Sequence, residues 1–89
     1  MINQEIARIF NEIADLLEIK GENLFRIRAY RRAAQNIDGL PHDAAKMSEK
    51  ELLEIPGIGR DLAGKILEYT STHTVRAYEE LKKEVPQGL

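Results

Sequence analysis

Apolar side chains recur at steps of three and four residues along the first half of the chain, a spacing typical of amphipathic helices. The first stripe predicts a helix over residues 3–19, because Gly21 just beyond it can act as a stop. The second stripe predicts a helix over residues 23–37, which a glycine and a proline end in the run Asp38-Gly39-Leu40-Pro41. The first half is therefore predicted to form two helices.

The second half carries shorter stripes. Ser48 and Glu51 have the spacing of a capping box and predict the start of a short helix that stops before Pro56, whereas residues 41–47 are compatible with a helical turn. No segment alternates with a period of two, so we predict an all-α fold, a compact bundle of four to five short helices. The stripes that predict the last two helices comprise Leu62, Ala63, Ile66, Leu67 and Tyr69, and then Val75, Tyr78, Leu81 and Val85 before Pro86.

Length and composition narrow the class of protein. A chain of 89 residues without cysteine is one small domain that has no disulfide and no thiolate zinc site. We expect residues 1–85 to form this domain and residues 86–89 to begin a linker, so that the chain is a fragment of a longer protein. No apolar run reaches the roughly 20 residues of a membrane span, so we expect a cytoplasmic protein with no membrane partner.

The net charge of −2 hides an uneven distribution of charge. Residues 23–37 contain four arginines and no acid, and positive charge is also concentrated around residues 60–65. If the two segments meet in space, a mildly acidic protein has one basic face, which is suited to nucleic acid.

The stretch "EIPGIGRDLAGKI" has the form helix, hairpin, helix. Pro56 stops one helix, Gly57 and Gly59 permit backbone conformations and close approaches that side chains forbid, and Ile58 is predicted to point into the core. The next helix begins at about Arg60, so its unpaired N–H groups and positive dipole end favour a phosphate. The alternative is a tight turn whose glycines serve packing alone. A dinucleotide-binding loop is excluded, because the third glycine and the preceding strand are missing.

The run of apolar residue, Pro, Gly, apolar residue and Gly, followed by Ala63 and Ile66, resembles the helix-hairpin-helix DNA-binding motif. With "RAYRRAAQNI" ahead of it, the chain resembles the amino-terminal domain of the polymerase beta-like family X DNA polymerases of bacteria and archaea. The resemblance implies a monomer that anchors the 5′-phosphate side of gapped or nicked DNA during base excision repair. It also implies a parent DNA-directed DNA polymerase, a nucleotidyltransferase dependent on divalent metal. The domain itself requires no cofactor.

The residues expected to act follow from the hairpin, the charge pattern and the resemblance. By resemblance, Lys65 lies in the register of the family's Schiff-base lysine with Tyr30 beside it, and Phe25 occupies a base-stacking position. Resemblance also implies a Na⁺ or K⁺ ion on the carbonyls of Leu53, Ile55 and Ile58 when DNA is bound. The full set expected to contact DNA is Gly57, Ile58, Gly59, Arg60, Lys65, Phe25, Arg26, Arg28 and Arg31.

The chain departs from the family pattern at three positions. Leu53 and Asp61 replace lysines, and Gly64 replaces a glutamate. Three hypotheses therefore stay open, namely a DNA-binding domain without chemistry, the same domain acting as a deoxyribose-phosphate lyase, and a helical protein-interaction domain. The lyase needs an amine that condenses with an aldehyde, and the lysine pKa must then fall well below its ordinary value of about 10.4.

Overall fold

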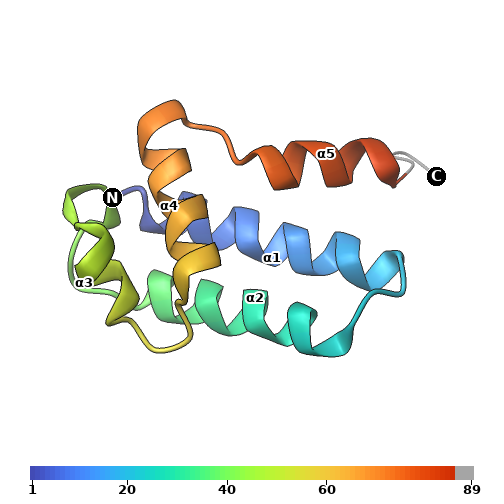
Figure 1. Ribbon diagram of the computed structural model, residues 1–89, viewed down its shortest axis with the longest axis horizontal. Helices are drawn as coiled ribbons and strands as arrows, with labels where there is room; N and C mark the ends of the chain where they lie inside the picture. The colour runs from blue at the N-terminus through green and yellow to red at the C-terminus, as the bar shows by residue number, and fades with distance from the viewer. Residues whose placement is uncertain (86–89) are drawn as a thin grey trace.

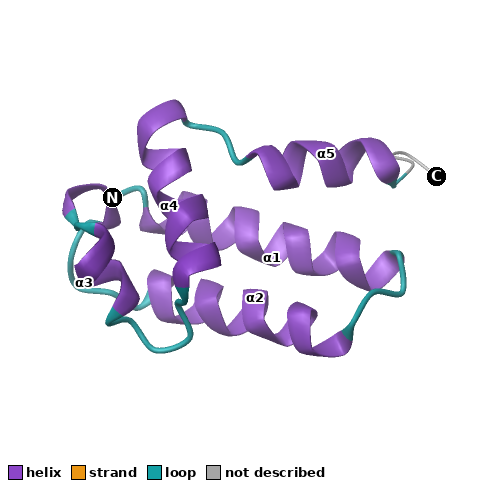
Figure 2. Ribbon diagram, in the orientation of Figure 1, coloured by secondary structure: helices purple, strands orange, loops and turns teal. Residues whose placement is uncertain are grey.

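The structure, a computed structural model, describes residues 1–85 and contains five α-helices and one 3₁₀ turn in that range. Figure 2 shows that helices joined by loops make up the described chain, with no strand, which confirms the predicted all-α fold. The boundary predicted at residues 86–89 lies outside the described residues. In chain order the elements are α1 (Asn3–Ile19), α2 (Leu24–Asp38), η1 (Ala44–Lys46), α3 (Glu49–Leu53), α4 (Arg60–Thr72) and α5 (Arg76–Glu84).

Helix α1 lies at the centre of the domain. Figure 1 shows α2 along one side of α1 and α5 along the other, with α3 and α4 gathered at the end where the chain begins. The apolar stripes meet in one core, in which the Phe10 and Ile13 side chains of α1 have no exposed surface. Tyr30 of α2 packs edge-on to Phe10, with 5.6 Å between the ring centroids. The predicted stripes are therefore the faces that the helices bury.

The helix starts follow local side-chain chemistry. The Asn23 side chain accepts a hydrogen bond from the Phe25 N–H at 2.7 Å and begins α2, one residue later than the stripe predicted. The predicted capping box is present at the start of α3, where Ser48 and Glu51 each accept the other's backbone N–H. The Ser48 backbone N–H, and then its hydroxyl, lower the pKa of Glu51.

A buried asparagine ties the connection after α2 to the start of α1. Asn3 is 1% exposed, accepts the Ala44 N–H at 2.8 Å and donates to the His42 carbonyl at 2.7 Å. The ambiguous segment 41–47 thus becomes the single turn η1, held by a side chain some forty residues earlier in the chain. Local sequence carries no sign of this contact.

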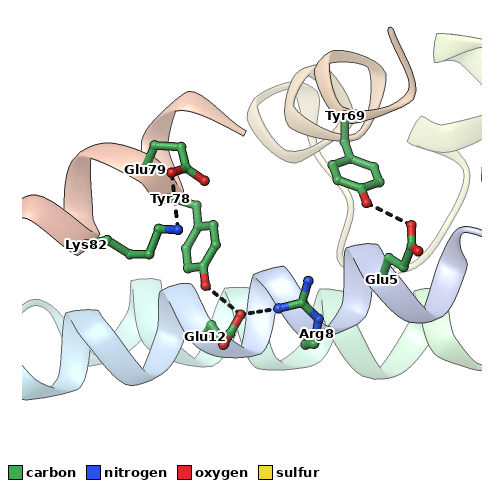
Figure 3. Close-up of polar contacts among 7 residues, drawn as sticks. All are labelled: Glu5, Arg8, Glu12, Tyr69, Tyr78, Glu79 and Lys82. Carbon is green, nitrogen blue, oxygen red and sulfur yellow. Dashed lines mark hydrogen bonds and ion pairs between the residues drawn. The ribbon is translucent and has the colours of Figure 1, made fainter. Parts of the chain in front are cut away.

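Helices α4 and α5 are held to α1 by tyrosine hydroxyls. Figure 3 shows Tyr69 of α4 donating to Glu5 at 2.8 Å and Tyr78 of α5 donating to Glu12 at 2.7 Å. The bond to Glu5, followed by burial, raises the pKa of Tyr69, and burial followed by the bond to Glu12 raises the pKa of Tyr78. None of the helices in residues 1–85 is both long and apolar enough to cross a bilayer.

Candidate nucleic-acid interface

The hairpin between α3 and α4 comprises residues 54–59. Gly57 has φ +86°, a left-handed conformation that only glycine adopts without strain. Ile58 is 4% exposed, so its side chain enters the core as predicted. Gly59 differs from the prediction, because its φ of −96° suits any residue and a β-carbon there would meet open space. Backbone conformation therefore explains why Gly57 is glycine but does not explain Gly59.

The junction of hairpin and α4 presents unpaired backbone donors. Gly59 is the N-cap of α4 and supplies no side-chain cap, and the first bond of the helix runs from the Ala63 N–H to the Gly59 carbonyl at 2.9 Å. A helix start without a cap leaves its N–H groups and positive dipole end available to an anion. Within residues 1–85, the backbone N–H groups that donate to no other residue here are those of Gly57, Gly59, Arg60, Asp61 and Leu62.

The hairpin is fastened to α2. The Asn36 side-chain amide donates to the Pro56 carbonyl at 2.6 Å. The Arg32 side chain lies against Gly57, since a β-carbon built on that glycine would be 3.3 Å from Arg32 Cγ and 3.4 Å from Cδ and Nε. The hairpin accordingly lies beside the later turns of α2 in Figure 1. Tyr30 of α2 also interacts with Lys65 of α4, so the two positively charged segments of the sequence, residues 23–37 and 60–65, meet in space.

The arginines of α2 fall into two groups. Arg26 Nη1 lies 3.7 Å from Glu22 Oε1. Arg31 Nη2 lies 2.9 Å from Asp15 Oδ1 and 3.5 Å from Glu18 Oε1, and both of these acids belong to α1. Among the described residues, Arg28 and Arg32 of α2 and Arg60 of α4 form no ion pair. The structure thus turns Arg31 toward α1, while its role in DNA binding stays a prediction.

Phe25 is 78% exposed at the first turn of α2. It is seven positions before Arg32, about two helical turns, so the two residues lie on the same face of α2 about 10 Å apart along its axis. An exposed ring beside free cations can stack on an unpaired base.

Lys65 lies at the edge of the core, as its place in the helical register predicts. Its side chain is 16% exposed, and Nζ donates to Asp61 Oδ1 at 2.7 Å. Burial lowers the pKa of Lys65, but the hydrogen bond to Asp61 and the interaction with the Tyr30 hydroxyl outweigh it, so the net shift is upward. The predicted neighbours Lys65 and Tyr30 are brought together, and the amine is held as an ammonium ion in this state.

The carbonyls predicted to hold a monovalent cation belong to the same turn. The Ile55 carbonyl accepts the Ile58 N–H at 3.0 Å, which uses one of its lone pairs. Ion binding by the carbonyls of Leu53, Ile55 and Ile58 stays a prediction.

Sequence reasoning missed Asn36, and it included Arg32 only as one of the four arginines of residues 23–37, without distinguishing it from Arg31. Arg32 and Asn36 are four positions apart and therefore share one face of α2. The buried stripe through Ile27, Tyr30 and Ala34 indicates only that Arg32 points away from the core, and the sequence carries no signal that the hairpin lies there.

Two comparisons with known proteins agree with this geometry. A family model described as "Helix-hairpin-helix domain" matches residues 1–75. The chain is also similar to the DNA polymerase/3'-5' exonuclease PolX of Bacillus subtilis (strain 168), with 36% identity over 90 residues. That alignment covers 100% of this chain and 15% of the Bacillus protein, so the chain spans a small part of the length of its curated relative.

Proposed function

Because the chain belongs to the helix-hairpin-helix domain family, we propose that it anchors the 5′-phosphate side of gapped or nicked DNA, without regard to base sequence, during base excision repair. One observation carries the proposal, namely the group of five unpaired backbone N–H groups at the junction of the hairpin and α4. Arg60 and Arg32 lie at this junction without an acidic partner in the described part of the chain.

Backbone donors explain both the affinity and the lack of sequence preference. N–H groups at a helix start bind a phosphate oxygen with help from the helix dipole. A phosphate contact fixes the position of the protein on DNA but carries no information about the base. The exposed Phe25 ring adds a stacking surface, which every base can use.

The likeness to the Bacillus protein supports a place for the domain in a family X DNA polymerase, a nucleotidyltransferase dependent on divalent metal. In this proposal the domain delivers the 5′ end of a gap while the polymerase extends the opposite end. The protein acts as a monomer in the cytoplasm, and Na⁺ or K⁺ on the carbonyls of Leu53, Ile55 and Ile58 neutralises part of the phosphate charge.

The test is binding to DNA with a one-nucleotide gap that carries either a 5′-phosphate or a 5′-hydroxyl, measured by fluorescence anisotropy over a series of salt concentrations. We expect tighter binding to the phosphorylated gap and a linear fall of log K with log salt concentration. A helical protein-interaction domain would bind neither DNA in a salt-sensitive way, and that result would refute the proposal. Equal affinity for the two gaps would refute the 5′-phosphate preference alone.

A second candidate function, deoxyribose-phosphate lyase, has support from one observation. Lys65, five residues into α4, has a side chain that is 16% exposed and an amine that interacts with Tyr30. In the reaction Nζ adds to the C1′ aldehyde of an incised abasic site and water leaves to give an iminium ion. A base then removes a C2′ proton, and the C3′–oxygen bond breaks to release the 3′-phosphate.

Because Asp61 holds the Lys65 amine protonated, the lyase requires this ion pair to open when substrate binds. Borohydride trapping on incised abasic DNA tests the reaction, with Lys65→Ala as the matched variant. An adduct that forms with the wild type and is lost in the variant supports the lyase. No adduct from a wild type that still binds the DNA would refute it and leave the anchoring function intact.

A further inference from the structure

The contact between α2 and the hairpin places one unpaired arginine against the glycine turn. The methylene groups and Nε of Arg32 lie along Gly57, where a β-carbon would come within 3.3 to 3.4 Å of them. The left-handed φ of +86° already requires glycine at this position, and the Arg32 stem occupies the space that a side chain would take. Gly57 and Arg32 therefore fit each other as a pair.

The fastening of the hairpin keeps Gly57 beside the stem of the exposed Arg32 side chain. Asn36, one turn further along α2, donates to the Pro56 carbonyl at 2.6 Å and holds the turn against the helix. A guanidinium whose stem is held by packing loses less side-chain entropy when it binds a phosphate than a freely moving one. Arginine also offers a planar fork of donors that matches two phosphate oxygens.

The adjacent Arg31 has a different environment. It lies between Asp15 and Glu18 of α1, at 2.9 and 3.5 Å, so two carboxylates offset its single positive charge. Exposed ion pairs of this kind are weak, but the local net charge is negative and does not attract phosphate. Arg32 forms no ion pair or hydrogen bond within residues 1–85 that would compete with a ligand.

We infer that Arg32 is a DNA-contacting residue of this domain, that its guanidinium binds the phosphate next to the one held by the hairpin amides, and that Asn36 is the positioning residue that aligns hairpin and helix. The inference rests on the proposed DNA-binding function. The Arg32 stem lies against Gly57 of the hairpin, so its guanidinium stays close to the phosphate that the hairpin amides hold. Consecutive phosphates of one DNA strand are only a few ångströms apart, so the ligand of Arg32 is a phosphodiester of that same strand.

The experiment compares Arg32→Met with Arg31→Met and with Arg76→Met, using the gapped, 5′-phosphorylated DNA and a series of salt concentrations. Methionine keeps an unbranched apolar stem against Gly57 and removes the charge, so a packing role alone predicts unchanged binding. Arg76 is the neutral control, because its side chain is 85% exposed and its helix, α5, lies on the opposite side of α1 from α2 (Figure 1).

Loss of one phosphate contact makes the negative slope of log K against log salt concentration shallower by about 0.9. Relative to the wild type, this corresponds to about eightfold weaker binding at 0.1 M salt. We expect this result for Arg32→Met, a smaller effect for Arg31→Met and none for Arg76→Met. Arg32→Lys restores the charge without the fork, so it should recover the slope and part of the affinity.

Asn36 is tested with the same DNA. We expect Asn36→Ala to weaken binding to the 5′-phosphorylated gap more than to the 5′-hydroxyl gap, because the misplaced hairpin loses its grip on the terminal phosphate. A merely structural role would lower the melting temperature and weaken both DNAs equally, which contradicts the positioning role.

The outcomes separate the inference from the function beneath it. Wild-type protein that shows no salt-dependent binding would refute the proposed function. Wild-type binding with an unchanged slope in Arg32→Met, or a larger loss in Arg31→Met, would overturn the inference and leave the function standing.

Discussion

Substitution of the two hairpin glycines by alanine should affect different properties, namely stability at Gly57 and DNA binding at Gly59. In Gly57→Ala the new β-carbon sits on a residue with φ +86° and approaches the Arg32 stem at 3.3 Å. A left-handed conformation costs an alanine about 1 to 2 kcal/mol, so this variant should be destabilised by at least that amount. For a domain of this size, the melting temperature should fall by about 4 °C or more.

Gly59→Ala places its methyl group in open space at φ −96°, so the fold offers no clash. Alanine is a poorer N-cap than glycine, but it also restricts the unfolded chain by about 0.4 to 1 kcal/mol, and the two effects nearly cancel. In the proposed function a phosphate approaches the free N–H groups of this residue and the next three, so the methyl group should hinder its approach. A hydrogen bond to a charged group contributes about 1.5 to 3 kcal/mol, so losing one weakens binding about tenfold to a hundredfold.

The assay pairs thermal unfolding, followed by circular dichroism, with anisotropy titration of 5′-phosphorylated gapped DNA. We expect Gly59→Ala to melt close to the wild type and to bind DNA at least about tenfold more weakly. We expect Gly57→Ala to melt lower. A Gly59→Ala protein that is folded and binds as tightly as the wild type would refute the reasoning, because the free N–H groups would then contact no phosphate.

Two further predictions concern the charges and hydroxyls around this framework. Asp61→Asn removes a carboxylate from the first turn of α4, so the pKa of Lys65 should fall, which NMR titration measures. The affinity for 5′-phosphorylated DNA should rise up to about fivefold. Weaker binding would contradict this and show that Asp61 supports the DNA complex. The fold raises the pKa of Tyr78 and so favours its neutral form. The contribution of this group to the free energy of unfolding is therefore fully present below the ordinary tyrosine pKa of about 10, and it is lost as pH rises from there through the raised pKa. Urea unfolding at pH 8 and at alkaline pH should show Tyr78→Phe less stable by about 0.5 to 1.5 kcal/mol at pH 8 and less sensitive to the rise; equal pH sensitivity of the two proteins would contradict this.

The helices could be predicted from sequence because each one buries a stripe that local spacing already displays. The stripe that predicts residues 3–19 coincides with α1, and the capping box of Ser48 and Glu51 is formed as predicted. Such signals depend on neighbours within one turn, where sequence distance and spatial distance agree. The hairpin could be predicted for the same reason, since Pro56 and Gly57 act on their own backbone, whereas the backbone of Gly59 needs no glycine.

Contacts between distant segments explain what sequence did not predict. Asn3 holds the turn after residue 42, which only the folded chain brings near it. The difference between Arg31 and Arg32 is of the same kind, because it depends on which flank of α2 meets the acids of α1 and which meets the hairpin. Charge counting along the chain treats the two arginines as equal, and the fold gives them different partners.

The net charge of −2 is compatible with the proposed basic binding face, because four acids of α1 have partners within the fold. On α1, Glu5 and Glu12 accept the hydroxyls that hold α4 and α5, and Asp15 and Glu18 face Arg31 (Figure 3 shows the first two). Each of these carboxylates already has a hydroxyl or guanidinium partner within the fold, so they oppose DNA less than their number indicates. Asp61 is the exception, since it stands in the first turn of α4 beside the free N–H groups. Because Asp61 also pairs with Lys65, the Asp61→Asn variant measures how much this one carboxylate opposes phosphate binding and how much it raises the pKa of Lys65.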